Sequence, residues 1–326
     1  MRRRSKQRRN PATLTILTGA TLLLAPIFAF GQTAPPAKAE TPDSGETVFS
    51  SETRLVPLNV SVIDKSGHLV TNLPQSAFTV MENGAPQQIR LFKREDVPVS
   101  LGLIIDNSGS MREKRQSVES AALALVRDSN RQDESFVVNF NDEAYLDADF
   151  TSDIKLLEQG LTKLDARGGT AMRDAIRMSI DHLKDKAKRD KKVILVVTDG
   201  NDNASAMSLE GLVRLAQQED VLIYAIGLLS EEEKKEARKA KRALDLLVES
   251  TGGQAFYPKD VTEVDKIAHE VAHDIRNQYT IAYTPTNQAL DGSFRQVKIM
   301  VKAPGNPVAR TRQGYYARQE RASKKP

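Results

Sequence analysis

Two patterns of hydrophobic and polar positions divide the chain. From Arg54 to Phe92, and again after Asn277, apolar and polar residues alternate in short runs, which is typical of strands with one buried face. Between these regions, nearly continuous apolar runs alternate with helical patterns. Such apolar runs predict parallel strands that are buried on both faces. The pattern therefore predicts a β region, an α/β region and a second β region.

The central region predicts a doubly wound α/β fold. The predicted strands are 99–105, 136–138, 193–197 and 221–226. The predicted helices are roughly 113–129, 171–187, 208–219, 232–250 and 261–277. Strands and helices in this alternation favour a Rossmann-like, mainly parallel sheet.

The two alternating regions predict short strands joined by tight turns. Glu82-Asn83-Gly84 separates two runs of the first region, and Asn-Gly between alternating runs is typical of a β-hairpin. The predicted strands are 55–63, 78–81, 88–92, 279–283, 297–301 and 308–311. Neither region holds enough strands for a robust sandwich of its own. We therefore expect the two regions to pair into one β-sandwich, into which the α/β region is inserted.

These patterns predict a chain of several segments. Residues 32 to about 47 are rich in Pro, Ala, Thr and Glu and cannot bury enough apolar surface to become ordered. The predicted segments are a signal peptide (1–31), a disordered linker (32–53), an N-terminal β segment (54–96), an α/β domain (97–277), a C-terminal β segment (278–317) and a disordered tail (318–326).

The first 31 residues resemble a secretory signal. Six basic residues precede an apolar stretch from Leu14 to Phe30, and small residues occupy the two positions of Ala29-Phe30-Gly31 that a signal peptidase reads. The alternative is an uncleaved membrane anchor, but the run is short, contains Pro26 and carries three threonines. We expect export to the periplasm, the cell surface or the extracellular space, with no membrane span after cleavage.

The net charge changes sign when the predicted signal is removed. The chain carries 47 basic and 43 acidic side chains, for a formal charge of +4. Residues 1–31 hold six of the basic residues and none of the acidic ones, so +4 becomes −2 in the remaining chain. This balance argues against a nucleic-acid partner. The chain contains no cysteine, so it forms no disulfides in any compartment.

Three short segments carry oxygen donors next to predicted strands and helices. Asp106-Asn107-Ser108-Gly109-Ser110 follows the first buried strand, Gly168-Gly169-Thr170 precedes a helix, and Thr198-Asp199-Gly200 follows a later strand. Ligands of doubly wound sheets bind beyond the carboxyl ends of the strands. The candidate ligands are Asp106, Ser108, Ser110, Thr170 and Asp199. This all-oxygen group, without His or Cys, suits Mg²⁺ or Mn²⁺.

The combination of these three segments resembles the metal ion-dependent adhesion site of von Willebrand factor type A (VWA) domains, over about residues 97–277. The resemblance implies that Ser108, Ser110 and Thr170 supply hydroxyls. It also implies that Asp106 and Asp199 act as carboxylates, directly or through water. The flanking strands look similar to those of exported VWA proteins that are common in acidobacteria.

The resemblance implies a metal-dependent adhesion module rather than an enzyme. Two carboxylates and three neutral hydroxyls leave a divalent cation with an open position and residual positive charge. An acidic side chain of a protein partner would complete the coordination shell, which is how many VWA ligands bind. The sequence leaves open the identity of the partner, the oligomeric state and any switching of the site between affinity states.

A second motif supports a different function. His269-Glu270-Val271-Ala272-His273 fits H-E-x-x-H, in which two histidines on one helical face bind Zn²⁺ and the glutamate acts as a base. The apolar stripe of this helix lies opposite both histidines, so we expect them to face solvent. A third zinc ligand is also hard to find, because no histidine follows His273. A zinc metallopeptidase therefore remains the alternative to the adhesion module.

Overall fold

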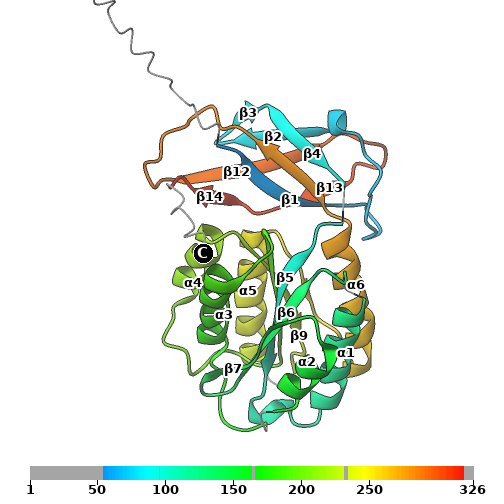
Figure 1. Ribbon diagram of the computed structural model, residues 1–326, viewed down its shortest axis with the longest axis vertical. Coiled ribbons are helices and arrows are strands. Elements are labelled where there is room, and N and C mark those ends of the chain that lie inside the picture. The colour runs from blue at the N-terminus through cyan, green and yellow to red at the C-terminus, as the bar shows by residue number, and fades with distance from the viewer. Residues whose placement is uncertain (1–53, 95, 129, 164–165, 231–233, 319–326) are drawn as a thin grey trace, which may run out of the picture. The chain divides into compact units, whose positions relative to one another are not determined.

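The computed structural model describes residues 54–318, except 95, 129, 164–165 and 231–233. This part of the chain forms an α/β unit and two smaller antiparallel sheets (Figure 1). The predicted signal peptide and linker lie outside the described residues, as does the predicted tail beyond Arg318. Among the residues described, no helix is both long and apolar enough to span a membrane.

A six-stranded sheet with the order β10-β9-β8-β5-β6-β7 forms the centre of the α/β unit. Its strands are β5 (Val99–Asp106), β6 (Glu134–Phe140), β7 (Ala144–Thr151), β8 (Lys191–Thr198), β9 (Val221–Gly227) and β10 (Ala255–Phe256). Every pairing is parallel except that of β6 with β7. The predicted Rossmann-like, mainly parallel fold is therefore confirmed.

Helices cover both faces of this sheet (Figure 1). On one face lie α1 (Arg115–Arg127), α2 (Ile154–Leu161) and α6 (Val264–Arg276). On the other face lie α3 (Met172–Lys186), α4 (Leu209–Gln218) and α5 (Lys234–Thr251). Every residue of β5, β6 and β9 is buried between these two layers. This double burial explains the nearly continuous apolar runs of the central strands.

Strand β7 and helix α2 were not predicted from the sequence. No residue of β7 is fully buried, and its sequence mixes acidic and apolar residues because it is the edge strand of the sheet. Helix α2 has only eight residues. Its first turn is capped by the side chain of Asp153, which accepts a hydrogen bond from the backbone N–H of Lys155 at 2.9 Å.

The remaining strands form two four-stranded antiparallel sheets, with the orders β13-β1-β11-β4 and β14-β12-β2-β3. The strands are β1 (Val56–Ile63), β2 (Phe78–Glu82), β3 (Ala85–Gln87), β4 (Ile89–Lys93), β11 (Tyr279–Tyr283), β12 (Phe294–Val301), β13 (Val308–Arg310) and β14 (Gly314–Tyr316). Each sheet combines strands from before and after the α/β unit. One apolar core joins their inner faces, so the two alternating regions pair as predicted.

The predicted hairpin around Asn83 and Gly84 has a shorter second strand than the sequence indicated. Both turn residues have positive φ, +47° and +81°, as a two-residue hairpin turn requires. The strand that pairs with β2 is β3, directly after the turn, whereas residues 89–93 pair with β11 in the other sheet. The assignment of 88–92 to this hairpin was therefore wrong, because three residues complete the pairing before the chain changes sheets.

Buried polar contacts join the α/β unit to the β1-containing sheet. The carboxylate of Asp274, on α6, accepts hydrogen bonds from Ser61 of β1 at 2.6 Å and from Tyr224 of β9 at 2.7 Å. It also forms an ion pair with Arg310 of β13. The ammonium of Lys191 donates to the carbonyl of Ile275 at 2.5 Å, at the end of α6. The last helix of the α/β unit is therefore fixed to both the central sheet and the sandwich.

Candidate metal site

Asp106 is the last residue of β5, and its side chain is buried. One carboxylate oxygen accepts the hydroxyl hydrogen of Thr198 at 2.5 Å, and the other accepts the backbone N–H of Ser108 at 2.7 Å. Burial raises the pKa of Asp106 to about 6, and the charge of Asp199 adds to this increase, while the two hydrogen bonds oppose it. The protein thus holds this carboxylate in an environment that disfavours its charge.

The two predicted serine ligands connect the Asp106 loop to Asp199. The hydroxyl oxygens of Ser108 and Ser110 lie 3.2 Å apart. Ser110 donates to Oδ1 of Asp199 at 2.8 Å. Asp199 follows β8, the strand beside β5, and is buried. The ends of these neighbouring strands therefore place four predicted ligands in one connected group.

Thr170, the fifth predicted ligand, lies beside the same group. Its backbone N–H donates to the side chain of Asn203 at 2.9 Å, and its carbonyl accepts the N–H of Asn203 at 3.1 Å. Its hydroxyl oxygen lies 3.6 Å from the position that a Cβ on Gly200 would take. The N–H of Gly109 also donates to the carbonyl of Gly168 at 3.3 Å. The three predicted segments therefore converge at one edge of the sheet.

A family model described as "von Willebrand factor type A domain" matches residues 101–201. The chain contains a VWA domain. All five predicted ligands fall within the matched segment, which runs from β5 to just past β8. The acidobacterial subtype remains a resemblance in sequence. No curated protein sequence matches the chain significantly.

Several solved structures resemble parts of this fold. The PilB minor pilin from Streptococcus sanguinis is 14% identical with a TM-score of 0.44, over 56% of this chain and 62% of the pilin. Proximal thread matrix protein 1 from the mussel byssus, "with zinc occupied MIDAS motif", is 18% identical with a TM-score of 0.48, over 60% of this chain and 49% of that protein. The vWF domain of the type V pili tip protein Mfa5 from Porphyromonas gingivalis is 14% identical with a TM-score of 0.44, over 55% of this chain and 97% of that domain. This chain thus spans less than two thirds of the first two proteins.

The glycines before Thr170 are required by a close contact in this VWA domain. Gly168 has φ +76°, and a Cβ there would lie 2.1 Å from a carboxylate oxygen of Asp142. The N–H of Gly169 donates to the same carboxylate at 2.7 Å. Asp142 therefore positions the loop that carries Thr170. Asp142 was not predicted from the sequence, because it follows β6 with no recognisable motif.

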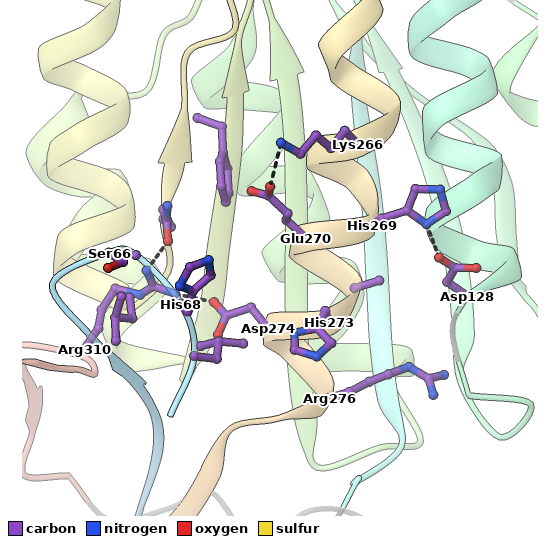
Figure 2. A pocket seen from close by; sticks show the side chains of 16 residues that line it. Ser66, His68, Asp128, Lys266, His269, Glu270, His273, Asp274, Arg276 and Arg310 are labelled. Carbon is purple, nitrogen blue, oxygen red and sulfur yellow. Dashed lines mark hydrogen bonds and ion pairs between the residues drawn. The ribbon is translucent and has the colours of Figure 1, made fainter. Parts of the chain in front are cut away.

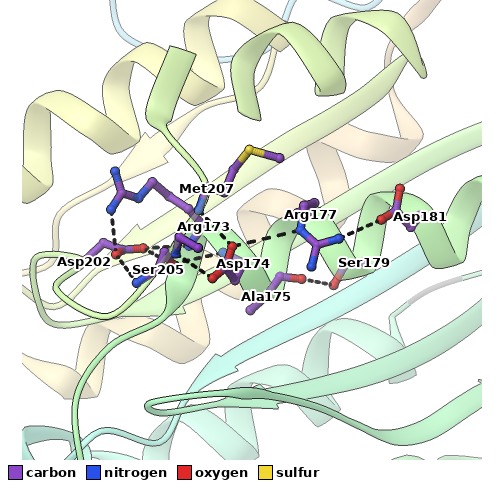
Figure 3. Close-up of polar contacts among 10 residues, drawn as sticks. Arg173, Asp174, Ala175, Arg177, Ser179, Asp181, Asp202, Ser205 and Met207 are labelled. Carbon is purple, nitrogen blue, oxygen red and sulfur yellow. Dashed lines mark hydrogen bonds and ion pairs between the residues drawn. The ribbon is translucent and has the colours of Figure 1, made fainter. Parts of the chain in front are cut away.

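A second group of polar contacts holds the loop after Asp199 against the start of α3 (Figure 3). Asp202 accepts the backbone N–H of Arg173 at 2.7 Å and its guanidinium at 2.9 Å. Asp174 accepts the backbone N–H groups of Ala206 at 2.8 Å and Met207 at 3.1 Å. These contacts fix the loops of Thr170 and Asp199 relative to each other, so the site is positioned by the protein itself.

Lys114 is a charged residue beside the predicted ligands that was also not predicted from the sequence. Its ammonium lies 2.5 Å from Oδ2 of Asp199 and 3.5 Å from the carbonyl of Leu228. The side chain of Lys114 is 30% exposed, whereas that of Asp199 is 1% exposed. Lys114 precedes α1 directly, where a lysine in the sequence is indistinguishable from an ordinary solvated residue.

The donors of this site fit a small divalent cation. The predicted ligands offer carboxylate and hydroxyl oxygens only, and hard cations such as Mg²⁺ and Mn²⁺ prefer oxygen. A cation beside Asp106 would also favour the charged form of this carboxylate, against the effect of burial. The residues present are therefore suitable for Mg²⁺ or Mn²⁺.

The H-E-x-x-H motif lies elsewhere, beside a cavity of about 1030 Å³ between α6 and the turn after β1 (Figure 2). Nδ1 of His269 pairs with Asp128 of the loop after α1, and its Nε2 lies 3.6 Å from Asp265. The hydrogen bond that His269 donates to the carboxylate of Asp128 raises the pKa of His269, whereas zinc binds neutral histidine. Both His269 and His273 are exposed, as predicted. Among the described residues, no three His, Cys, Asp or Glu side chains gather as metal ligands.

Proposed function

We propose that this chain is an exported VWA protein that holds Mg²⁺ or Mn²⁺ at one edge of its sheet and binds protein partners through that cation. The observation that carries the proposal is the convergence of three loops on one group of oxygen atoms. The proposed ligands are Asp106, Ser108, Ser110, Thr170 and Asp199.

The composition of the site supports binding of an acidic partner. When bound, the cation supplies a Lewis-acidic position that can accept an oxygen ligand from another molecule. The protein offers two carboxylates and three neutral hydroxyls, so its own side chains do not saturate a cation that takes six ligands. A glutamate or aspartate of a partner would bind with its carboxylate at the remaining position.

The contacts of the serines favour a binding function over an enzymatic one. Ser108 and Ser110 contact each other, and Ser110 donates to Asp199. Nucleophilic catalysis by serine needs an adjacent base such as histidine. The histidines of the H-E-x-x-H motif instead lie exposed on α6, where His269 pairs with Asp128.

Metal titration tests the site directly. We expect mature protein to bind one Mg²⁺ or Mn²⁺ in calorimetry, and we expect Asp106→Ala to lose this binding. A matched control is Asp181→Ala, which removes an exposed carboxylate that pairs with Arg177 on α3. If Asp106→Ala binds Mg²⁺ as tightly as the parent and the control, the site assignment is wrong.

Partner binding and export need separate experiments. A column of mature protein with Mg²⁺ should retain its partner until EDTA is added, and a column of Asp199→Ala should retain none. Export rests on the sequence of residues 1–31. N-terminal sequencing of exported protein should begin near Gln32, and recovery of only full-length, membrane-embedded protein would establish an anchor instead.

A further inference from the structure

A positive charge is built into the proposed metal site. The ammonium of Lys114 lies 2.5 Å from one oxygen of Asp199, and the hydroxyl of Ser110 lies 2.8 Å from the other. The Asp199 side chain is almost completely buried, and the Lys114 side chain is partly buried. A cation that binds among the hydroxyls must therefore share this carboxylate with a lysine.

Counting formal charges shows what Lys114 changes. Asp106, Asp199 and Lys114 together carry −1, so a divalent cation brings the site to +1. Without Lys114 the same site would carry −2 alone and would be neutral with the cation. Arg112 and Asp142 also lie near these loops, but both are exposed, and water and salt screen their charges.

We propose that Lys114 lowers the intrinsic cation affinity of the site and keeps the cation-loaded site electropositive, so that an acidic partner binds more tightly. This inference rests on the proposed metal site. Lys114 repels the cation because like charges beside one carboxylate raise the free energy of the bound state. The same positive charge attracts an incoming carboxylate. Lys114 therefore makes cation binding weaker and acidic-partner binding stronger.

The repulsion between Lys114 and the cation depends on the charge of the bound ion, whereas a purely structural role of Lys114 would not. Coulomb energy is proportional to the charge of the bound ion, so loss of Lys114 should favour a trivalent ion more than a divalent one. Lys114→Met keeps the length of the side chain and removes its charge. Because the charge of Lys114 is partly exposed, we expect a moderate effect. Lys114→Met should bind Mn²⁺ about 10-fold more tightly than the parent, and Tb³⁺ about 30-fold more tightly.

Three further variants control this experiment, with all affinities measured by calorimetry on the mature chain. Lys114→Arg keeps the positive charge and should keep the affinities of the parent for both ions. Lys184→Met breaks a comparable ion pair, 2.6 Å long, with Glu219 at the ends of α3 and α4, and should also leave both affinities unchanged. Lys114→Gln is a second neutral variant, in case Lys114→Met fails to fold.

Polyglutamate is the probe for the acidic partner. In the presence of saturating Mn²⁺, Lys114→Met should bind polyglutamate several-fold more weakly than the parent or Lys184→Met. In EDTA neither protein should bind polyglutamate, because the empty site is negatively charged with or without Lys114. The two effects of the substitution thus have opposite signs, tighter cation binding and weaker binding of the acidic probe.

The outcomes separate this inference from the proposed function. If the parent binds neither Mn²⁺ nor Tb³⁺, the metal-site proposal fails and the role of Lys114 fails with it. If the parent binds both ions but the neutral variants show no gain, or equal gains for both ions, the role of Lys114 alone is overturned. An unchanged affinity of Lys114→Met for polyglutamate would also overturn it.

Discussion

Two buried aspartates of the α/β unit differ in what surrounds them. Asp274, at the junction with the sandwich, accepts hydroxyl hydrogens from Ser61 and Tyr224 and pairs with Arg310. Asp106, at the opposite end of the central strands, accepts hydrogen bonds from neutral donors only. The charge of Asp274 is thus compensated inside the protein, whereas that of Asp106 has no direct cationic partner among the described residues.

This difference separates a structural carboxylate from one that we propose to bind a cation. A buried charge is costly unless another charge or hydrogen bonds compensate for it. Burial and the nearby Asp199 raise the pKa of Asp106 to about 6, which means that the folded protein resists its ionisation. A bound cation would remove this cost. The neighbouring Lys114 compensates Asp199 rather than Asp106.

The largest effect should come from breaking the compensated junction. Asp274→Ala leaves Arg310 and Tyr224 without their buried acceptor, and we expect a loss of about 3 kcal/mol in the free energy of unfolding. Urea denaturation measures this loss. The exposed control Asp181→Ala should cost less than about 0.5 kcal/mol. A similar small loss for Asp274→Ala would show that the junction contributes little to stability.

The second expected effect is stabilisation by the cation. Mg²⁺ at about 100 times its dissociation constant should raise the free energy of unfolding of the parent by about 2.7 kcal/mol, because it binds the folded state only. The same addition should leave Asp106→Asn and Asp199→Ala unchanged in thermal denaturation. Asp274→Ala, if folded, should still respond to Mg²⁺. Equal stabilisation of all these variants would place the cation elsewhere.

The third expected effect concerns the protein without metal. The pKa of Asp106 is raised from 3.8 to about 6 on folding, so its ionisation destabilises the folded state as pH rises through this window. At pH 7 the full cost is present. A pKa shift of this size corresponds to about 3 kcal/mol. Asp106→Asn removes this cost but offers one acceptor oxygen instead of two, so it should stabilise the metal-free protein by about 2 kcal/mol in urea denaturation. A less stable Asp106→Asn would show that its hydrogen bonds outweigh its burial.

The fold was predictable where burial leaves a simple pattern. The central strands β5, β8 and β9 are covered on both faces, so their sequences are almost wholly apolar. Strand β7 is half-exposed at the sheet edge and carries no such pattern. The change of sheet after β3 was equally hidden, because residues 89–93 alternate as they would in either sheet.

The residues of the proposed site could be selected from the sequence where they form motifs at the ends of strands and helices. The five proposed ligands lie in three such segments, and the structure brings these segments together. Three other residues contact these segments from distant positions in the sequence. Lys114 is 85 residues from its partner Asp199. Asn203 is 33 residues from Thr170, and Asp142 is 27 residues from Gly169. Their residue types are ordinary on protein surfaces, and only the folded chain shows which loop each one holds.

The smallest expected effect lies on the helix that carries Asp274. His269 and His273 are on the exposed side of α6, and Asp274 is on its buried side. Replacing both histidines with alanine should change the free energy of unfolding by no more than about 0.5 kcal/mol, because exposed polar changes usually cost little. Metal binding at the Asp106 site should also be unchanged.

Zinc content and proteolysis decide whether these histidines have a further role. Mass spectrometry of the purified parent should find no stoichiometric zinc bound through α6, and a generic protein substrate should remain intact, because His269 is paired with Asp128 rather than free to bind a metal. The double alanine variant is the matched control for zinc content. Stoichiometric zinc in the parent, together with cleavage that Glu270→Gln abolishes, would replace the adhesion proposal with a metallopeptidase. It would also mean that the exposed face of α6, and not only the edge of the sheet beside Asp106, binds a metal.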